Sequence, residues 1–166
     1  MLIRPAVASD AEAIRTIYNA EVLGSETTTF DLVPRTPEEQ DAWLARHQGA
    51  HPAVVATAGN GKDQIVTGFG ALSVYRTRPA YSTTVENSVY VHRDHRGAGV
   101  GRALLDELVR LAGLHGFHTV VARVVRENEA SIALHRACGF EVVGTEREIG
   151  RKHGRWIDVV ELQRML

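Results

Sequence analysis

The stretch from Val89 to Arg102 constrains the fold of this 166-residue chain more than any other part of the sequence. It reads as the end of an apolar strand, a short basic turn and three glycines at alternate positions that open a helix. Such a turn presents backbone N–H groups at a helix N-terminus, where the helix dipole favours an anion. Glycine lets a phosphate approach the backbone without a Cβ in the way. Because Arg93, Arg96 and Arg102 add positive charge, the sequence predicts a strand–turn–helix unit that binds a pyrophosphate.

Length and composition are those of one domain with its own core, spanning residues 1–166. The formal net charge of −1 gives no support to nucleic acid or an acidic membrane as the main partner. The one cysteine, Cys138, cannot form an internal disulfide and is expected in the core. The sequence shows neither a signal-peptide pattern nor an apolar run long enough to span a bilayer, so we expect a cytoplasmic protein.

Two helix start signals organise the N-terminal part of the chain. A short strand near 2–5 precedes a helix near 10–20, whose start is indicated by the capping box Ser9-Asp-Ala-Glu12. Thr36-Pro-Glu-Glu39 repeats the signal, with proline at the first helical position. The pattern therefore predicts a strand followed by two helices.

Three strands are expected next. Residues 53–58 and 64–74 read as an antiparallel hairpin joined by the turn Gly59-Asn-Gly-Lys62. Residues 83–91 alternate between two faces and place Glu86 on the polar one.

The C-terminal half alternates helices and strands. The glycine turn opens a helix with a broad leucine stripe, which ends at Gly116. The elements expected after it are a buried strand at 119–125, a short helix at 129–137 capped by Asn128, and strands at 141–148 and 156–162 joined by the turn 150–154. The order β-α-α-β-β-β-α-β-α-β-β predicts an α/β (α+β) fold with a mixed sheet flanked by helices.

The glycine turn also carries a family signature. Arg96-Gly-Ala-Gly-Val-Gly101 fits the (Gln/Arg)-x-x-Gly-x-(Gly/Ala) pattern and resembles the GNAT superfamily of N-acetyltransferases. A flexible strand-to-helix turn is the alternative interpretation. A Rossmann motif fits less well, because the spacing is G-x-G-x-G and several strands precede it. No Gly-Lys-Ser/Thr follows, which excludes a Walker A loop.

A second segment is similar to another motif of the same superfamily. Asn128-Glu-Ala-Ser-Ile-Ala-Leu-His-Arg-Ala-Cys-Gly-Phe140 has asparagine at a strand end and Gly-Phe closing a helix. The resemblance implies a mostly antiparallel central sheet in which strands 83–91 and 119–125 splay apart and hold acetyl-CoA. The cofactor-binding residues that it implies are Val89, Tyr90, Val91, Arg96, Gly97, Ala98, Gly99, Val100, Gly101, Arg102 and Asn128, with the pyrophosphate on residues 97–102.

Further matches narrow the resemblance to the phosphinothricin and methionine sulfoximine or methionine sulfone acetyltransferase family, from about residue 2 to the C-terminus. They are Phe30, Thr36-Pro37, Arg76-x-Arg78, Thr84–His92, His135 and Lys152–Asp158. The resemblance implies acetylation of the α-amino group of a small amino acid or analogue, resistance to herbicides or antibiotics of that kind, and a homodimer.

Glu86 is the residue expected to do chemistry. An amine must lose a proton before or during attack on a thioester, and a carboxylate can accept it directly or through water. A less exposed site would raise the pKa of Glu86 toward a useful range. A base and an anchor for the substrate amine remain alternatives, as does an ordinary strand glutamate paired with an arginine.

His135 lies near the end of the helix in the second motif. Many members of the superfamily have a tyrosine in this region that protonates the leaving thiolate, and the narrower family resembles this chain in having histidine. Histidine has a suitable pKa for that role. A half-buried histidine that packs on the sheet is the structural alternative.

The acceptor site is expected around the loop before strand 83–91. Paired guanidinium groups such as those of Arg76 and Arg78 suit a carboxylate or phosphinate, although a solvated basic loop has the same composition. The predicted acceptor-binding residues are Phe30, Arg76, Thr77, Arg78, Glu86, Asn87 and Ser88, with Tyr81 and Trp156 as further candidates for the pocket wall. The N–H of Val91 is the candidate donor to the tetrahedral oxyanion.

Other functions stay open at this point. An acetyltransferase for a protein N-terminus, a polyamine or an aminoglycoside is the first alternative, and a non-catalytic acyl-CoA sensor is the second. The pair His92-x-x-His95 has no third ligand at convincing spacing and H-E-x-x-H is absent, so we expect no metal.

Overall fold

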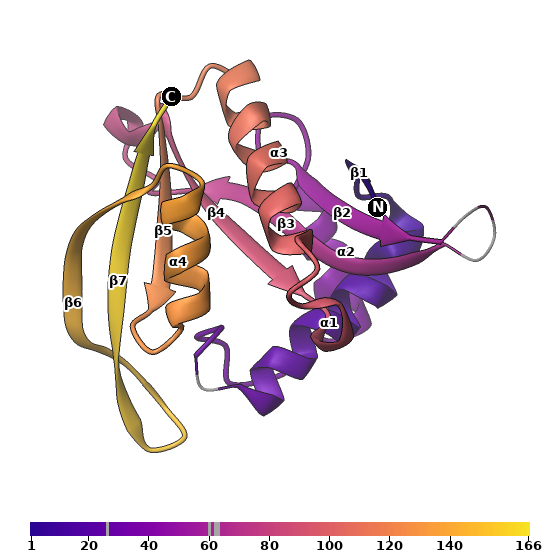
Figure 1. The fold of residues 1–166 in the computed structure, drawn as a ribbon, viewed down its shortest axis with the longest axis horizontal. Helices are drawn as coiled ribbons and strands as arrows, with labels where there is room; N and C mark the ends of the chain where they lie inside the picture. The colour runs from indigo at the N-terminus through magenta and orange to yellow at the C-terminus, as the bar shows by residue number, and fades with distance from the viewer. Residues whose placement is uncertain (26, 60, 62–63) are drawn as a thin grey trace.

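The computed structural model describes residues 1–25, 27–59, 61 and 64–166, and over these residues seven strands form one sheet. The sheet has the order β1-β2-β3-β4-β5-β7-β6 (Figure 1). Its strands are β1 Leu2–Pro5, β2 Ala53–Ala58, β3 Ile65–Val74, β4 Thr84–Val91, β5 Thr119–Val125, β6 Glu141–Lys152 and β7 Arg155–Met165. Only β4 and β5 pair in parallel, and the other neighbours are antiparallel. The predicted order of elements and the mixed sheet are confirmed.

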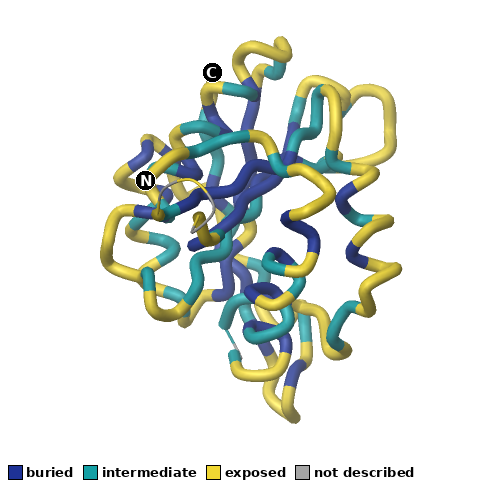
Figure 2. The backbone as a smooth tube through the Cα atoms, turned by 90° about the vertical axis from the view of Figure 1, so that its right-hand side faces the viewer, coloured by how far each residue is buried: buried dark blue, intermediate teal, exposed yellow. Residues whose placement is uncertain are grey.

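Helices cover both faces of the sheet. Leucines of α3 (Val100–Leu114) and the end of α4 (Glu129–Ala137) pack on one face against β2–β5 and β7. Apolar side chains of α1 (Ala11–Gly24) and α2 (Pro37–Arg46) pack on the other, against β2 and β3. Buried backbone is concentrated in the central strands, while loops and outer helix faces are exposed (Figure 2). The fold therefore buries two apolar clusters, one on each side of the sheet.

The pairing of β4 with β5 is short. Thr84, Val85 and Glu86 face residues 119–121 of β5, and the pairing stops there. Beyond Glu86, β4 continues along β3 as far as Val91, while β5 continues along β7 as far as Val125. The two strands diverge from Glu86 onward, and the predicted splayed pair is confirmed.

The start of α1 differs from the prediction. Ser9 lies within a 3-10 turn, Ala8–Asp10, and α1 runs from Ala11 to Gly24, beyond the predicted end at residue 20. Asp10 replaces the expected capping box, because its carboxylate accepts hydrogen bonds from the backbone N–H of Val7 at 2.9 Å and from the Arg4 guanidinium at 2.7 and 2.8 Å. An ion pair brought in from β1 thus fixes the start of this helix, which local sequence could not show.

The start of α2 is as predicted. The Thr36 hydroxyl accepts from the N–H of Glu39 at 3.2 Å, and the Glu39 carboxylate accepts from the N–H of Thr36 at 2.8 Å. The first hairpin, β2–β3, is also confirmed, except that β3 begins at Ile65. Of its predicted turn, Asn60 and Lys62 lie outside the described residues.

The C-terminal hairpin is longer than predicted. β6 reaches Lys152 and β7 begins at Arg155, so the turn is only His153-Gly154, with φ of +48° and +80°. Positive φ at both central residues matches the right-handed twist of a tight hairpin. The register shifts between Glu146 and Gly150. This irregularity, on a largely polar and exposed strand, hides the alternation that would have revealed the full length.

Candidate active site

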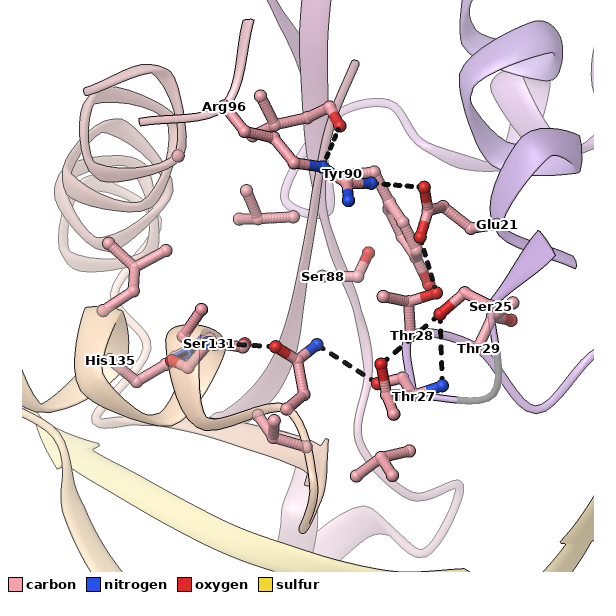
Figure 3. Close-up of a pocket in the computed structure, with 18 of the residues that line it drawn as sticks. Glu21, Ser25, Thr27, Thr28, Thr29, Ser88, Tyr90, Arg96, Ser131 and His135 are labelled. Atoms are coloured by element: carbon pink, nitrogen blue, oxygen red, sulfur yellow. Dashed lines mark hydrogen bonds and ion pairs between the residues drawn. The ribbon is translucent and has the colours of Figure 1, made fainter. Parts of the chain in front are cut away.

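A cavity of about 980 Å³ opens where β4 and β5 diverge (Figure 3). The end of α1 and the loop after it form one wall, and the turn before α3 and the start of α4 form others. The cavity gathers most of the predicted site residues: Phe30, Glu86, Asn87, Ser88, Val89, Tyr90, Val91, Arg96, Gly97, Gly99, Val100, Gly101, Arg102, Asn128 and His135. Ala98, Arg76, Thr77 and Arg78 are not among its lining residues.

The glycine turn has the backbone that an anion site needs. Gly97 and Gly99 have φ of +76° and +81°, which glycine adopts readily, and Gly99 caps α3 without a side chain. The first N–H groups of a helix have no partner within the helix, so those of α3 can bind an anion in the cavity. Gly101 serves packing instead, because a Cβ there would lie 3.2 Å from Leu134 of α4.

Beyond Glu86, the edge of β4 that faces the cavity has no strand partner among the described residues. The N–H of His92 donates to Thr67 on β3 at 2.9 Å. Because successive residues of a strand point their backbone groups to opposite edges, those of Val89 and Val91 point to the other edge, into the gap. The Val91 carbonyl accepts there from Nε of Arg96 at 3.3 Å. An extended ligand arm in the gap can therefore pair with Val89 and Val91.

Glu86 is the last β4 residue paired with β5, and it lines the cavity. Burial raises the pKa of its carboxyl group above the ordinary value; Arg123 opposes the rise, and Glu161 and Glu146 add to it. Arg123 is itself paired with Glu146. The position thus favours the protonated carboxyl more than water does and brings the pKa of Glu86 toward the range of a general base.

His135 is buried, and acceptor groups face both of its ring nitrogens. Nδ1 lies 2.8 Å from the Ser131 carbonyl and Nε2 lies 3.1 Å from Oδ1 of Asn87. The Asn87 amide nitrogen donates to the Val121 carbonyl at 3.0 Å, which orients that amide. Burial lowers the pKa of His135, and the bond to Ser131 opposes this. The structure thus places the imidazole on the cavity wall, between α4 and β4.

The predicted acceptor arginines lie on an exposed loop after β3. The Arg76 guanidinium is 4.9 Å from the ring centre of Tyr75 and 5.3 Å from that of Tyr81. Tyr75 in turn donates to Glu161 at 3.1 Å. The loop begins near Glu86, because Ser73 pairs with Glu86 across β3 and β4. The loop that carries Arg76 and Arg78 therefore starts on the Glu86 side of the cavity, and neither arginine is among the residues that line it.

Several wall residues carried no motif. They come from the end of α1 and the loop after it: Ala20, Glu21, Gly24, Ser25, Thr27, Thr28 and Thr29. The available signal was an acidic residue on the apolar side of the first helix, Glu21, which is only 9% exposed. Asn128, predicted from the second motif, caps α4 by accepting from Ser131 at 3.1 Å and donates to the Thr27 carbonyl at 3.1 Å.

Within the described residues, no three His, Cys, Asp or Glu side chains gather as a metal-binding group. The His92 and His95 rings lie 5.7 Å apart, tilted by 58°. None of the described helices is long and apolar enough to cross a membrane.

Comparison with known proteins assigns the class. The model of the acetyltransferase (GNAT) domain matches residues 3–160. A phosphinothricin N-acetyltransferase of Streptomyces coelicolor is 38% identical, over 99% of this chain and 95% of that protein. An L-methionine sulfoximine/L-methionine sulfone acetyltransferase of Pseudomonas paraeruginosa is 37% identical, over 97% and 92% of the two chains.

A solved structure supports the same class of protein. The phosphinothricin acetyltransferase of Sinorhizobium meliloti in complex with AcCoA superposes with a TM-score of 0.92 at 38% identity, covering 99% of this chain and 88% of that one. This chain belongs to the GNAT acetyltransferase family. It is an N-acetyltransferase, which transfers an acetyl group to an amino group.

Proposed function

We propose that this enzyme transfers the acetyl group of acetyl-CoA to the α-amino group of a small amino acid or analogue of the phosphinothricin, methionine sulfoximine or methionine sulfone type. One observation carries the proposal: a single cavity connects the glycine turn to Glu86, where β4 and β5 part. Relatives of nearly the same length bear those substrate names. These substrate names, together with the Glu86 carboxylate on the cavity wall, support an amino acid as the acceptor.

The residues present fit acetyl-CoA along the whole cavity. The diphosphate would bind the free N–H groups at residues 97–102, with charge from Arg96 and Arg102. The pantetheine arm would pair with the open edge of β4 at Val89 and Val91. The thioester would then lie next to Glu86, with the N–H of Val91 available to the oxyanion.

Direct attack needs two proton movements. The amine nitrogen bonds to the thioester carbon, the C–S bond breaks, and the coenzyme leaves as a thiolate that gains a proton. Glu86 would take the proton of the ammonium, directly or through water, and its raised pKa supports this role or that of an anchor for the ammonium. Orientation of the two substrates in one cleft supplies much of the remaining acceleration.

His135 would protonate the departing sulfur. Burial has the larger effect and lowers the pKa of His135, while the Ser131 carbonyl, 2.8 Å from Nδ1, acts to raise it. A doubly protonated ring can donate from the nitrogen nearer the thiolate.

The acceptor would bind between the loop after α1 and the loop after β3. Phe30 forms an apolar wall. Arg76 and Arg78 would receive its carboxylate or phosphinate, and Thr77, Asn87 and Ser88 would add polar contacts. This arrangement suits an anionic amino acid better than a polyamine or aminoglycoside, because the loop is basic.

A homodimer in the cytoplasm completes the proposal. Large apolar side chains are exposed on the β6–β7 hairpin and the loop after Phe30: Leu32, Val33, Val142, Val143, Ile149 and Trp156. Exposed apolar side chains favour association, and a second copy of the chain is the partner expected from the resemblance.

A thiol-release screen tests the proposed function. The purified protein and acetyl-CoA are offered the standard amino acids, phosphinothricin, methionine sulfoximine and methionine sulfone, beside a peptide N-terminus, a polyamine and an aminoglycoside. We expect release with an acidic or sulfone-type amino acid. Turnover only with a cationic amine would assign the first alternative, and binding without turnover would assign a sensor.

A further inference from the structure

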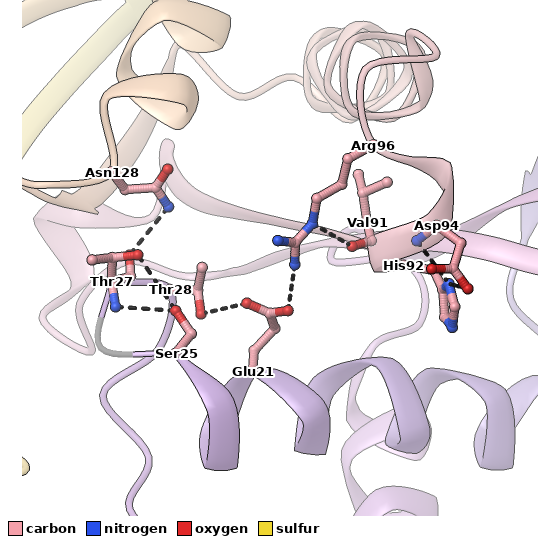
Figure 4. Close-up of polar contacts among 9 residues, drawn as sticks. All are labelled: Glu21, Ser25, Thr27, Thr28, Val91, His92, Asp94, Arg96 and Asn128. Atoms are coloured by element: carbon pink, nitrogen blue, oxygen red, sulfur yellow. Dashed lines mark hydrogen bonds and ion pairs between the residues drawn. The ribbon is translucent and has the colours of Figure 1, made fainter.

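Glu21, at the end of α1, is a buried carboxylate on the wall of the cavity, near the predicted diphosphate site (Figure 4). A negative charge at this place repels a bound diphosphate if it acts only through its field. The contacts of Glu21 indicate a different role.

Each oxygen of Glu21 holds a different segment. Oε1 accepts from Nη2 of Arg96 in the glycine turn. Oε2 accepts from the hydroxyl of Thr28, two residues before Phe30, at 2.8 Å. One carboxylate therefore connects the glycine turn to the loop that carries Phe30.

Arg96 is held at two of its three guanidinium nitrogens. Nη2 donates to Glu21, and Nε donates to the Val91 carbonyl at 3.3 Å. Within the described part of the chain, Nη1 has no hydrogen-bonding partner, although the Arg96 side chain is 53% exposed and lines the cavity. Arg96 can thus bind a phosphate oxygen through Nη1 while it keeps both existing contacts.

The loop after α1 has a second attachment. Asn128, which caps α4, donates to the Thr27 carbonyl at 3.1 Å. Figures 3 and 4 show Thr27, Thr28 and Glu21 on the side of the cavity opposite α4 and the glycine turn. Two of these polar contacts therefore cross the cleft, Asn128 to Thr27 and Glu21 to Arg96. The second one reaches the glycine turn.

We propose that Glu21 is a positioning residue, which aims Arg96 at the coenzyme diphosphate and, through Thr28, fixes the loop that carries Phe30. The carboxylate acts through Arg96 and touches neither reacting group. The half of this proposal that concerns Arg96 requires only that the protein binds coenzyme A. The half that concerns Phe30 rests on the function proposed above.

Whether Glu21→Gln tightens or weakens the binding of coenzyme A distinguishes a positioning role from a simple electrostatic effect. Glu21→Gln removes a negative charge near an anion, so a field effect alone tightens coenzyme A binding. Loss of positioning weakens it instead, because Arg96 then loses the ion pair that orders it before the ligand arrives. We expect a weakening of about 5–10-fold in Kd.

Calorimetry with coenzyme A measures this on the wild type, Glu21→Gln, Arg96→Gln and the double variant. In the Arg96→Gln background we expect Glu21→Gln to change Kd by less than about twofold, because the effects of residues that act as a unit are not additive. The control is Glu12→Gln on the same helix, where Glu12 pairs with Arg15 in an exposed position. It should leave Kd within about twofold.

Unchanged or tighter coenzyme A binding in Glu21→Gln overturns the part of the proposal that concerns Arg96, and so does a full additional loss of affinity in the double variant.

For the part that concerns the acceptor, Thr28→Val should raise KM for the acceptor by about threefold or more while the Kd of coenzyme A stays within about twofold, and Thr28→Ser should restore KM. An unchanged KM overturns this half. If the wild type acetylates no amino acid at all, the proposed acceptor is wrong, and the calorimetry still decides the Arg96 half.

Discussion

The ring of Phe30 lies directly on the backbone of Gly150, so closely that a Cβ at Gly150 would stand 2.1 Å from the ring carbon Cε1. A residue of the loop after α1 thus packs near the turn of the C-terminal hairpin, far away in the sequence. Since Phe30 also lines the cavity, the hairpin helps to set the position of this part of the cavity wall.

Gly150→Ala should therefore disturb the acceptor site without touching the coenzyme site. The added methyl group displaces Phe30, because such overlap forces side chains to move. Steady-state kinetics should show KM for the acceptor raised by about fivefold or more, with coenzyme A affinity unchanged. Gly144→Ala on the same strand is the matched control, since a Cβ there meets nothing within 4 Å. Equal KM values for the acceptor in the two variants would show that the position of Phe30 does not affect acceptor binding.

Glu86→Gln should lower kcat/KM by about 10²-fold or more if the carboxylate is the general base. The variant keeps the shape of the side chain, so coenzyme A should bind as in the wild type. A rate within a few-fold of the wild type across the pH range would remove Glu86 from this role.

Glu161→Gln should move the acidic limb of the kcat/KM profile to lower pH. Glu161 raises the pKa of Glu86, so its neutralisation lets Glu86 lose its proton at a lower pH. Since the base works deprotonated, activity then extends further into acid. Glutamine keeps an acceptor for the Tyr75 hydroxyl, which limits other changes. A limb that moves to higher pH, or stays in place, contradicts the assignment of that limb to Glu86.

Two substitutions of Asn87 should move the alkaline limb of kcat in opposite directions. Asn87→Ala removes the oxygen that faces Nε2 of His135, which lowers the pKa of the imidazole and starts the loss of activity at lower pH. Asn87→Asp places a negative charge there and shifts the loss to higher pH. Identical alkaline limbs in both variants would show that His135 does not donate the proton.

Asp10→Asn should destabilise the fold by about 1 kcal/mol at neutral pH, because Asp10 accepts from Val7 and pairs with Arg4. Burial acts to raise the pKa of Asp10, but the bonds from Arg4 and Val7 outweigh it and lower the pKa below its ordinary value. A lowered pKa gives stability that is present above the unfolded pKa and is lost as the pH falls through the folded one.

Urea unfolding at neutral pH and below about pH 4 checks this, and the difference between wild type and Asp10→Asn should shrink in acid. Asp41→Asn, at an exposed position of α2, is the control and should change stability little. A difference that stays constant with pH would show that the Asp10 charge contributes nothing.

Local signals predicted much of this molecule because local forces decide those parts. Gly97 and Gly99 adopt the backbone that their lack of a Cβ suggests, and the Thr36 and Asn128 caps satisfy nearby N–H groups. The family resemblance added the divergence of β4 and β5, which no periodicity would have revealed.

Contacts between distant residues escaped prediction. The partner of Arg96 is Glu21, which is 75 residues away, and Lys152 donates to the Thr29 carbonyl at 3.1 Å across 123 residues. The sequence does not indicate how far Arg76 and Arg78 lie from the cavity. The path of an exposed loop depends on the side chains that pack beneath it, and here these are Tyr75 and Tyr81. Tertiary packing sets these positions.

Because β4 and β5 pair over only three residues, the rest of the β4 edge is open. The extended arm of the thioester carrier would pair with this edge as a further strand does. Recognition then depends on main-chain groups that every amino acid possesses. Side-chain changes at Val89 and Val91 that keep the backbone in place should therefore leave binding of the carrier intact.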